Sequence, residues 1–489
     1  MMNRSMLAYI PVNISNIIVS FGLITVLTRL LSSSEFGMYG IAVITLQFMH
    51  MGLFTWLEAA MVRFLARAEK DDDVNSHLKT LYTYALWSFL IIWVGILAII
   101  FILPISNGMK NLFGFALTSG CLSIFFNLGM EAHKAAHRIK RYSLSYTLVK
   151  LLGFAIGIAL ILLTPLRESA PFIGVIIAMV CILIFDLPFM MKQMKGGKVE
   201  HSKIKTYFSY GMPISLSLLL TYTLSSGDMY IIKALMGDSA VGIYNAGYNL
   251  SNRSLDVLFV WIAMAVTPIA ITTLEQSGVE DSKRILHGYG VTLLWYILPA
   301  ATGIALVAEP AGFVLGESVR EGAVQIIPWI AFSGVLNGLI TYYAHRAFML
   351  SQKTQMFVWA MVPPAALNIG LNFWLIPLYG LMGAVYATIA AYGFGLIIAI
   401  LMGRRYYPLP LPFKEFFQIS LACLGMAACV MITPLPTDLP DFIELLIKAI
   451  IGVMAYGGIC YVTNAANSRN IMLDIIQKFR PKSTSIDAA

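Results

Sequence analysis

The chain has very little charge for its length. Charged residues make up 12% of its 489 residues and hydrophobic residues make up 58%, whereas about a quarter of the residues in an ordinary soluble domain are charged. Because so little polar surface is available, the chain cannot face water on all sides. This composition excludes a soluble globular protein and favours a protein that spans a lipid bilayer.

Long polar segments and reactive cysteines are also scarce. The longest polar stretches lie near residues 66–79, 191–205 and 464–489, and none is long enough to bury a core of its own. All five cysteines fall within apolar runs, where a thiol packs as a small hydrophobe rather than as a disulfide partner or metal ligand. We therefore expect no soluble catalytic domain, and the cysteines do not indicate a redox compartment.

Motifs for catalysis or metal binding are absent or weak. The chain has no glycine-rich phosphate loop of the kind that ATPases use. Asp71 to Asp73 resemble the paired carboxylates with which many glycosyltransferases hold a metal and a sugar nucleotide, but they lie in a solvated charge run, EKDDDVNSH. His133 and His137 have the spacing of two metal ligands, yet no third ligand accompanies them and basic residues surround them. We predict no catalytic residue, no metal and no cofactor, and interpret the His133 region as an anchor at the inner membrane surface.

Apolar runs are what the sequence has in abundance. A helix that spans the ~30 Å hydrocarbon core needs about 20 apolar residues, and fourteen runs approach this length. They lie near residues 6–31, 38–62, 80–104, 111–131, 142–164, 170–191, 206–235, 240–273, 286–308, 322–345, 355–377, 381–403, 414–433 and 442–463. The first run has no small-residue cleavage site, so we interpret it as a retained helix rather than a signal peptide. The expected fold is an all-α polytopic membrane protein with fourteen transmembrane helices.

Lys and Arg are distributed unevenly between the two sets of loops. Twenty-five of the 33 fall in the chain ends and in the loops after the even-numbered helices, five fall in the opposite loops, and Lys150, Arg253 and Lys448 lie within helices. Because cytoplasmic loops are enriched in Lys and Arg, this distribution predicts that both termini are cytoplasmic. The net charge of +8 then reflects topology and contact with anionic membrane lipids, and nucleic-acid binding is not needed to explain it.

One segment occurs twice along the chain. Leu23–Val43 reads LITVLTRLLSSSEFGMYGIAV and Asp228–Leu250 reads DMYIIKALMGDSAVGIYNAGYNL. Aligning Gly37 with Gly242 brings the apolar run, the short polar turn and the Gly-x-Tyr of both copies into register. Polar turns of this kind recur wherever two helices are joined, so a single match could arise by chance. Both copies nevertheless leave the cytoplasm in the same direction, which favours a parallel duplication.

A second repeated pattern supports duplication. Pro165 and Pro377 mark equivalent outer turns, between helices 5 and 6 and between helices 11 and 12. Parallel repeats related by an axis along the membrane normal are a transporter architecture in which two lobes rock about a central cavity. We therefore expect two parallel-repeat six-helix lobes around a central cavity, plus two C-terminal helices. The expected domains are residues 1–195 with helices 1–6, residues 196–405 with helices 7–12, residues 406–464 with helices 13 and 14, and a cytoplasmic tail at 465–489.

Cations in or beside the apolar runs are the first set of candidate site residues. Arg253 lies about twelve residues into helix 8, near mid-depth, where an Arg costs about 2.5–3.5 kcal/mol, so it should face protein or a wet cavity. Lys150 could project into the cavity or extend to the inner surface, and the remaining candidates could instead anchor helix ends. The cations that we expect to line the cavity and bind substrate are Arg253, Lys150, Arg29, Arg63 and Arg346.

Acidic residues inside the runs are the second set. Asp228, Asp256 and Glu58 could couple transport to H⁺ or Na⁺, or could pair with cations, and Asp256 is placed to form a neutral structural pair with Arg253. The cations outnumber these acids, which suits an anionic cargo, because Arg makes paired charge-assisted hydrogen bonds with phosphate or diphosphate. A drug or cation exporter would need an excess of acidic residues instead.

Two adjacent prolines interrupt helix 11. Pro363 and Pro364 remove two backbone donors about midway along this helix and predict a kink there. Asn368 and Asn372 follow closely, where their amides could satisfy the freed backbone groups or contact sugar hydroxyls. We predict that these four residues form a hinge and a polar lining, although the kink could be purely structural.

The stretch LNFWLIPLYGLMGAVYATIAAY, residues 371–392, resembles the most recognisable segment of the Wzx-type O-antigen and exopolysaccharide repeat-unit flippases. In that family an Asn, a Leu-Ile-Pro, a Tyr-Gly and a Gly-Ala-x-x-Ala-Thr follow one another at this spacing. The two copies of the repeated segment resemble the other family landmarks, with Asp228 at the usual acidic position. The resemblance spans both expected lobes, and the fourteen-helix layout agrees with it.

The resemblance implies a multi-pass protein of the bacterial inner membrane. Such a protein flips polyprenyl-diphosphate-linked oligosaccharide repeat units from the cytoplasmic to the outer leaflet by alternating access, for cell-surface polysaccharide biosynthesis. It is a transporter rather than an enzyme, and its partners include membrane lipids and possible contacts with a polysaccharide polymerase and chain-length machinery. Two alternatives stay open: a cation-coupled drug antiporter of the same superfamily, and a polyprenyl-linked polysaccharide polymerase, which would usually present a larger outer loop than this chain offers.

Overall fold

A computed structural model of the protein describes residues 10–353, 355–436 and 438–469, and within these ranges it contains helices and turns but no strand. Thirteen of the described helical segments are long and apolar enough to cross a membrane. The one expected span that is not among these thirteen, residues 206–235, corresponds to α9 (His201–Ser226) and α10 (Asp228–Met236), where many Ser, Thr and Tyr residues lower the hydropathy. The prediction of an all-α polytopic membrane fold is confirmed.

Contacts divide the chain into two compact units. Unit 1 comprises Met1–Ala246, Leu315–Gly322 and Gln355–Ala391, and unit 2 comprises Gly247–Val314, Ala323–Thr354 and Tyr392–Ala489. These units reflect which segments touch rather than which segments are repeated. The expected lobes at 1–195 and 196–405 therefore stay a prediction.

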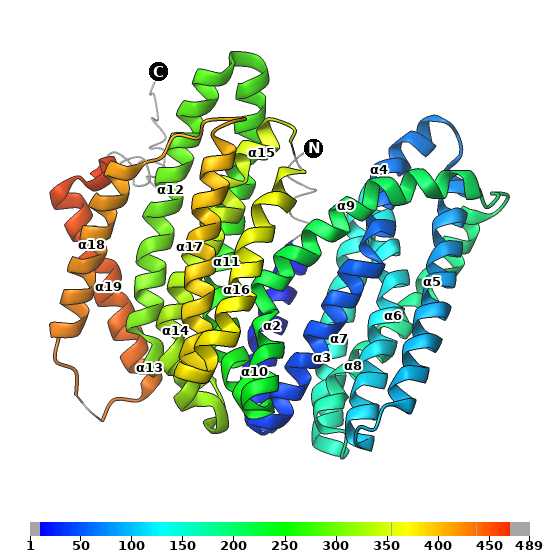
Figure 1. Cartoon of the computed structure of the whole chain (residues 1–489), viewed down its shortest axis with the longest axis horizontal. Helices are drawn as coiled ribbons and strands as arrows, with labels where there is room; N and C mark the ends of the chain where they lie inside the picture. The colour runs from blue at the N-terminus through cyan, green and yellow to red at the C-terminus, as the bar shows by residue number, and fades with distance from the viewer. Residues whose placement is uncertain (1–9, 354, 437, 470–489) are drawn as a thin grey trace, which may run out of the picture. The chain divides into compact units, whose positions relative to one another are not determined.

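Unit 1 is a bundle of long helices. Its elements are α2 (Ile10–Leu30), α3 (Ser33–Leu53), α4 (Thr55–Lys70), α5 (Val74–Ile102), α6 (Asn107–Ala135), α7 (Ile139–Leu163), η1 (Arg167–Ser169), α8 (Ala170–Met194), α9, α10 and α16 (Met356–Tyr379), with the first parts of α11 (Asp238–Ser277), α14 (Glu317–Gly338) and α17 (Leu381–Gly403). Helix α5 packs beside α6 and α7 packs beside α8, while α9 runs obliquely along α4 and α3 (Figure 1). The largest apolar cluster, around Leu57, Leu81 and Leu128, joins α4, α5 and α6.

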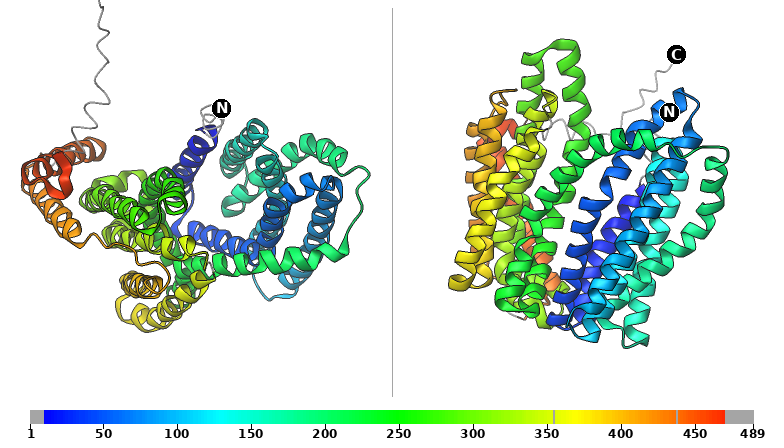
Figure 2. Two further views of the ribbon diagram at one scale, coloured as in Figure 1. Left: turned by 90° about the horizontal axis from the view of Figure 1, so that it is seen from above. Right: turned by 45° about the vertical axis from the view of Figure 1, so that its right-hand side comes forward.

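Unit 2 contains the remaining helices. Its elements are the longer parts of α11 and α14, the second part of α17, and α12 (Val279–Leu306), α13 (Ala308–Ala311), η2 (Gly312–Val314), η3 (Leu339–Ala344), α15 (Arg346–Leu350), α18 (Phe413–Ile432), α19 (Asp441–Thr463) and η4 (Ala465–Asn467). Helices α18 and α19 lie side by side (Figure 2) and α18 packs on α12, with Cys423 and Cys460 in the shared apolar cluster. The η3 segment is a turn of π-helix, a rare form that is frequent at functional sites.

The expected span at 38–62 is broken at Phe54, between α3 and α4. Side chains add hydrogen bonds at the break: Thr55 Oγ1 donates to the His50 carbonyl oxygen at 3.3 Å, beside the Phe54 amide at 2.9 Å, and the Trp56 indole donates to the Leu53 carbonyl oxygen at 3.0 Å. A helix end without such partners would leave buried polar groups unpaired. The break is therefore stabilised by local side chains and needs no proline.

The segment that follows α8 is tied to the N-terminal turns of α5. Asn75 Nδ2 donates to the Lys195 carbonyl oxygen at 3.0 Å, and Lys79 Nζ donates to the Gly197 carbonyl oxygen at 2.9 Å. Lys203, at the start of α9, also forms an ion pair with Asp73. This polar stretch, which the sequence indicated as a connection between two halves, is held in one place on unit 1.

The two copies of the repeated segment touch each other within unit 1. A Cβ atom on Gly37 would lie 1.9 Å from the Asp238 carbonyl oxygen, and a Cβ on Gly242 would lie 2.0 Å from the Ser33 carbonyl oxygen. Ser33 Oγ and Ser239 Oγ are 3.0 Å apart. The start of α3 therefore crosses the start of α11 at a distance that only glycine permits, and the aligned glycines of the repeat are the contact itself.

Candidate functional site

A buried carboxylate marks the break between α9 and α10. Asp228 is the first residue of α10 and is 1% exposed. The Tyr244 hydroxyl donates to Asp228 Oδ2 at 2.5 Å, and Thr388 Oγ1 donates to the same oxygen at 3.4 Å. Asp228 Oδ1 has no hydrogen-bond partner among the described residues. A buried carboxylate with one unpaired oxygen is energetically costly unless it takes up a proton or a cation.

Two asparagines of α16 extend this cluster. Asn368 and Asn372 are 1% and 0% exposed. Asn372 Nδ2 donates to the backbone carbonyl oxygen and the side-chain Oδ1 of Asn368, at 2.9 and 3.0 Å. Asn368 Nδ2 in turn donates to Thr388 Oγ1 at 3.5 Å. We call Asp228, Tyr244, Asn368, Asn372 and Thr388 the oxygen cluster, since it presents hydroxyl, amide and carboxylate oxygens from α10, α11, α16 and α17 inside unit 1.

The oxygen cluster has the donor set of a site for a proton or a small hard cation. Oxygen ligands that include one carboxylate suit such a cation, whereas soft metals prefer sulfur or imidazole. Asn372 Oδ1 is a second buried oxygen without a partner in the described part of the chain. The described residues contain no group of three or more His, Cys, Asp or Glu side chains that could hold a metal ion. A transition-metal centre is therefore not indicated there.

Some members of the oxygen cluster were candidates from the sequence and some were not. Asp228, Asn368 and Asn372 were candidates, and the structure brings them together. Tyr244 and Thr388 were missed as site residues, although both stand in the motifs that drew attention, the Gly-x-Tyr of the repeat and the Gly-Ala-x-x-Ala-Thr after α16. The sequence contained both motifs, but only the structure shows that Tyr244 and Thr388 donate to the same carboxylate.

Glu58 belongs to a separate polar group in unit 1. His50 Nε2 lies 3.0 Å from Glu58 Oε1, and Asn127 Nδ2 lies 3.5 Å from the same ring nitrogen. The His50 and Glu58 side chains meet across the helix break at Phe54, and each is 17% exposed. Sequence reasoning selected Glu58 and missed His50, because eight residues separate them and an unbroken helix would not suggest the contact.

The three candidate cations of unit 1 lie on three different helices, α2, α7 and α4, and are exposed. Arg29 stands in the last turn of α2. Lys150 Nζ lies 5.6 Å from the centre of the Tyr146 ring, and Arg63 Cζ lies 6.0 Å from the centre of the Tyr210 ring. A cation over an aromatic face is held weakly and can still turn toward an anion.

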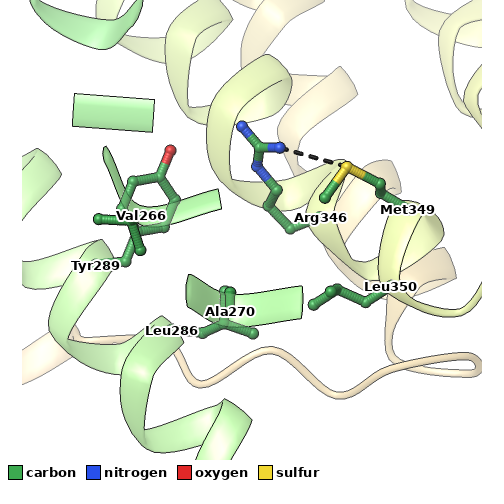
Figure 3. A pocket seen from close by; sticks show the side chains of 7 residues that line it. All are labelled: Val266, Ala270, Leu286, Tyr289, Arg346, Met349 and Leu350. Carbon is green, nitrogen blue, oxygen red and sulfur yellow. Dashed lines mark hydrogen bonds between the residues drawn. The ribbon is translucent and has the colours of Figure 1, made fainter. Parts of the chain in front are cut away.

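The candidate charges of unit 2 also occupy distinct positions. Arg253 is exposed on α11, and its Nε donates to Asn249 Oδ1 at 3.1 Å. The ion pairs of the described residues do not include Arg253 with Asp256, although the two lie one turn apart. Arg346 begins α15 (Figure 3), and its Nε donates to the Tyr342 carbonyl oxygen at 3.1 Å.

The double proline does not interrupt α16. The helix runs from Met356 to Tyr379 with Pro363 exposed and Pro364 buried. The amide of Asn372 bonds to Asn368 rather than to the carbonyl groups one turn before the prolines. The polar lining that was expected near the prolines therefore takes the form of an asparagine pair, while the predicted hinge stays a prediction.

Comparison with known sequences connects this arrangement to a family. A family model described as polysaccharide biosynthesis protein matches residues 3–273, more than half of the chain. A probable flippase of Haloferax volcanii, AglR, is 25% identical over 411 residues, which cover 80% of this chain and 82% of that protein.

Solved structures share the fold. The lipid II flippase MurJ in an inward closed conformation matches with a TM-score of 0.76 at 16% identity, covering 96% of this chain and 100% of that chain. An inward-facing multidrug resistance transporter of the MATE family and the MOP superfamily matches with a TM-score of 0.66 at 15% identity, covering 81% of this chain and 97% of that chain. At these identities the likeness concerns the fold alone. The match over residues 3–273 shows that the chain belongs to the polysaccharide biosynthesis protein family, and its long apolar helices make it a multi-pass membrane protein.

Proposed function

We propose that the protein flips polyprenyl-diphosphate-linked oligosaccharide repeat units from the cytoplasmic to the outer leaflet of the bacterial inner membrane by alternating access. The observation that carries the proposal is the match of residues 3–273 to a polysaccharide biosynthesis family. The excess of cations over acids among the candidate residues in or beside the apolar runs also favours an anionic cargo. Both termini are cytoplasmic in this proposal, as the distribution of Lys and Arg indicates.

The diphosphate is the part of the cargo that the protein must hold most firmly. Lys150 and Arg253 are each candidates to pair with it, because both stand well inside apolar helices and neither forms an ion pair among the described residues. The weak contacts of Lys150 with Tyr146 and of Arg253 with Asn249 can be exchanged for charge-assisted hydrogen bonds to phosphate. The polyprenyl chain stays in the lipid while the sugars cross a hydrated path.

The oxygen cluster is the site that we propose for ion coupling. A proton or Na⁺ on Asp228 would neutralise the buried carboxylate and fill its unpaired Oδ1. Thr388 links Asp228 to Asn368, so occupancy of the carboxylate changes the energy of packing α10 against α16 and α17. Ion release would loosen that packing and give the transport cycle a step that depends on the ion gradient.

The end of unit 1 at which Gly37 meets Gly242 is the outer end in this proposal, since it lies on the side with few Lys and Arg residues. The contact of the two repeated segments there supports an arrangement that is closed toward the outside. Cargo would then enter from the cytoplasmic leaflet first, and the contact would open in the later half of the cycle.

Reconstitution tests the proposal directly. The full chain is placed in lipid vesicles with labelled polyprenyl-diphosphate oligosaccharide, and translocation is followed by the label's accessibility. Lys150→Ala and Arg253→Ala should each slow translocation about tenfold or more, because a hydrogen bond to a charged group contributes about 1.5–3 kcal/mol. Lys448→Ala is the matched control, since Lys448 also lies within an apolar helix but is paired with Glu444 at 2.5 Å. A wild-type chain that leaves the labelled lipid on its original leaflet would contradict the proposed function.

A drug or cation antiporter is the second candidate function, and the fold shared with a multidrug transporter favours it. Such a protein would protect cells from toxic cations, and its loss would leave lipid-linked sugars unaffected. A deletion strain that accumulates lipid-linked repeat units on the inner leaflet and keeps normal drug tolerance supports the flippase. The opposite pattern supports the antiporter.

A further inference from the structure

The segment that joins α8 to α9 lies across the first two turns of α5, and we call its residues 195–203 the strap. Four side chains of α5 bond to the strap backbone: Asn75 Nδ2 donates to the Lys195 carbonyl oxygen at 3.0 Å, Lys79 Nζ donates to the Gly197 carbonyl oxygen at 2.9 Å, Ser76 Oγ accepts from the Lys198 amide at 3.2 Å, and Thr80 Oγ1 accepts from the Glu200 amide at 3.0 Å. The four α5 positions form two neighbouring pairs spaced i, i+4, so they lie on one side of the helix. The strap backbone therefore follows that side of α5.

Two glycines adapt the strap to this position. Gly196 has a φ of +83°, a conformation that glycine adopts far more readily than other residues. A Cβ atom on Gly197 would lie 2.3 Å from the Asn75 carbonyl oxygen, so the backbones of the strap and of α5 touch. Gly197 is buried, whereas Lys195 and Lys198 are exposed. The strap is thus a fitted element of unit 1 rather than a flexible linker.

The first turns of α9 continue the attachment. Lys203 forms an ion pair with Asp73, the residue that precedes α5. One turn later along α9, the Tyr207 hydroxyl lies 2.6 Å from Nδ1 of His77 on α5. Tyr207 is 3% exposed and His77 is 0% exposed. Moving α9 away from α5 would break this buried hydrogen bond, which is unfavourable because both groups would need new partners.

A backbone contact with α4 follows one turn farther along α9. A Cβ atom on Gly211 would lie 2.5 Å from the Trp56 carbonyl oxygen and 2.6 Å from Trp56 Cα. The ring centres of Trp56 and Phe208 are 5.3 Å apart, and the rings meet edge to face. Residues 195–211 are therefore attached to α4 and α5 by polar bonds, glycine contacts and aromatic packing.

This attachment conflicts with a joint at the sequence boundary between the repeated halves. The two copies of the repeated segment begin at Leu23 and Asp228, and the expected boundary between the halves lies at residues 195 and 196. If each half moved as one body, α9 would move with the second half. The strap would then have to leave α5, and the contacts of residues 195–211 would break in each cycle.

We infer that residues 195–211 form an anchor that stays on α4 and α5 while the protein moves, so that the joint between the repeated halves lies beyond Gly211 and not in the strap. By sequence the first part of α9 belongs to the second half, but the anchor makes it move with the first half. The inference rests on the proposed function, because it concerns the movement that carries cargo across the membrane.

A disulfide across the strap tests the anchor in the full chain. Ser76→Cys and Lys198→Cys are introduced after the five native cysteines have been replaced, and the Lys198 amide lies 3.2 Å from Ser76 Oγ, so the two residues are close enough to be bridged. In vesicles with the labelled lipid-linked oligosaccharide, the oxidised protein should translocate at the same rate as the reduced protein. Arrest by the disulfide, with recovery on reduction, would overturn the inference.

Ser33→Cys with Ser239→Cys is the matched comparison, because these hydroxyl oxygens are 3.0 Å apart where the two copies of the repeated segment touch. That contact opens in the proposed cycle, so its disulfide should stop translocation until it is reduced. Equal arrest of the two crosslinked proteins would show that the strap has to move as well, contrary to the inference.

Limited trypsin digestion measures the attachment without a transport assay. Lys195 and Lys198 are exposed in the strap, but cleavage beside them requires the backbone to leave α5. Gly197→Ala adds a methyl group at the backbone contact and should speed this cleavage about 5–150-fold, the range expected for an overpacked contact. Gly95→Ala is the control, since a Cβ on Gly95 meets nothing within 4 Å. Equal cleavage of the two variants would refute the anchor. If the wild-type chain does not translocate the labelled lipid, the proposed function fails and the digestion alone decides for or against the anchor.

Discussion

Replacing Gly37 or Gly242 by Ala should force apart the two copies of the repeated segment. An added Cβ would lie 1.9 Å from the Asp238 carbonyl oxygen at the first glycine and 2.0 Å from the Ser33 carbonyl oxygen at the second. A carbon atom and a carbonyl oxygen in close contact lie about 3.3–3.6 Å apart. The start of α3 and the start of α11 must therefore separate by about 1.3–1.7 Å to admit the methyl group.

The cost of this change falls on one arrangement of the helices. Overpacking a tight contact costs about 1–3 kcal/mol, and such a difference changes an equilibrium about 5–150-fold. The strain exists only while the two segments touch, so the substitution favours any conformation in which they are apart. The population of the touching arrangement should fall by that factor, while the rest of each helix is unaffected.

Cysteine crosslinking measures this population. Ser33 Oγ and Ser239 Oγ are 3.0 Å apart, so a cysteine pair at these positions should form a disulfide quickly in a chain whose five native cysteines have been replaced. Gly242→Ala should slow disulfide formation about 5–150-fold, in proportion to the smaller population of the touching arrangement. Gly95→Ala is the matched control, because a Cβ on Gly95 in α5 meets nothing within 4 Å. If the Gly242 and Gly95 variants crosslink at the same rate, the close contact does not limit any conformational equilibrium.

Two further predictions concern the oxygen cluster and an ion pair outside the membrane. Thr388→Val removes the hydroxyl that donates to Asp228, so the free energy of unfolding should fall by about 1–3 kcal/mol. The difference between the melting temperatures in Na⁺ and in K⁺ should also become smaller. A variant with the stability and ion dependence of the wild type would show that Thr388 is not part of the cluster. The hydrogen bond from Lys203 holds the pKa of Asp73 below its ordinary value, so the pair stabilises the protein above pH ~4 and this contribution disappears as the pH falls through the lowered pKa. Asp73→Asn should therefore destabilise the protein by at most about 1 kcal/mol at pH 7, and its melting temperature should converge with that of the wild type in acid, whereas a difference that persists at low pH would point to a packing effect.

The helices could be predicted from the sequence, but two of their breaks could not. A run of about 20 apolar residues is needed to cross a bilayer whatever its neighbours are, so the expected spans correspond closely to the helices. The break at Phe54 is accompanied by hydrogen bonds that the Thr55 and Trp56 side chains donate to backbone carbonyl oxygens. These bonds exist only in the folded structure, so the sequence pattern did not indicate the break. The break at Gly227 likewise has no proline to announce it. Helix α16 continues through Pro363 and Pro364, and the kink predicted there stays a prediction.

The candidate site was predicted in part. Membrane depth and motif resemblance selected Asp228, Asn368 and Asn372 one by one, because a polar residue in an apolar run is costly and needs a reason. Neither criterion shows partners. Thr388 is 160 residues from Asp228 along the chain, and only the packing of α17 against α10 makes it a donor to that carboxylate.

Composition and apolar runs by themselves determined that this chain is a polytopic helical membrane protein, because each of these properties is a sum over local residues and is independent of how the helices pack. Tertiary structure decided that the two copies of the repeated segment touch at their glycines, and that Asp228 keeps one oxygen unpaired among the described residues. Close approach and hydrogen-bond satisfaction depend on distances between residues far apart in the chain, and folding sets those distances.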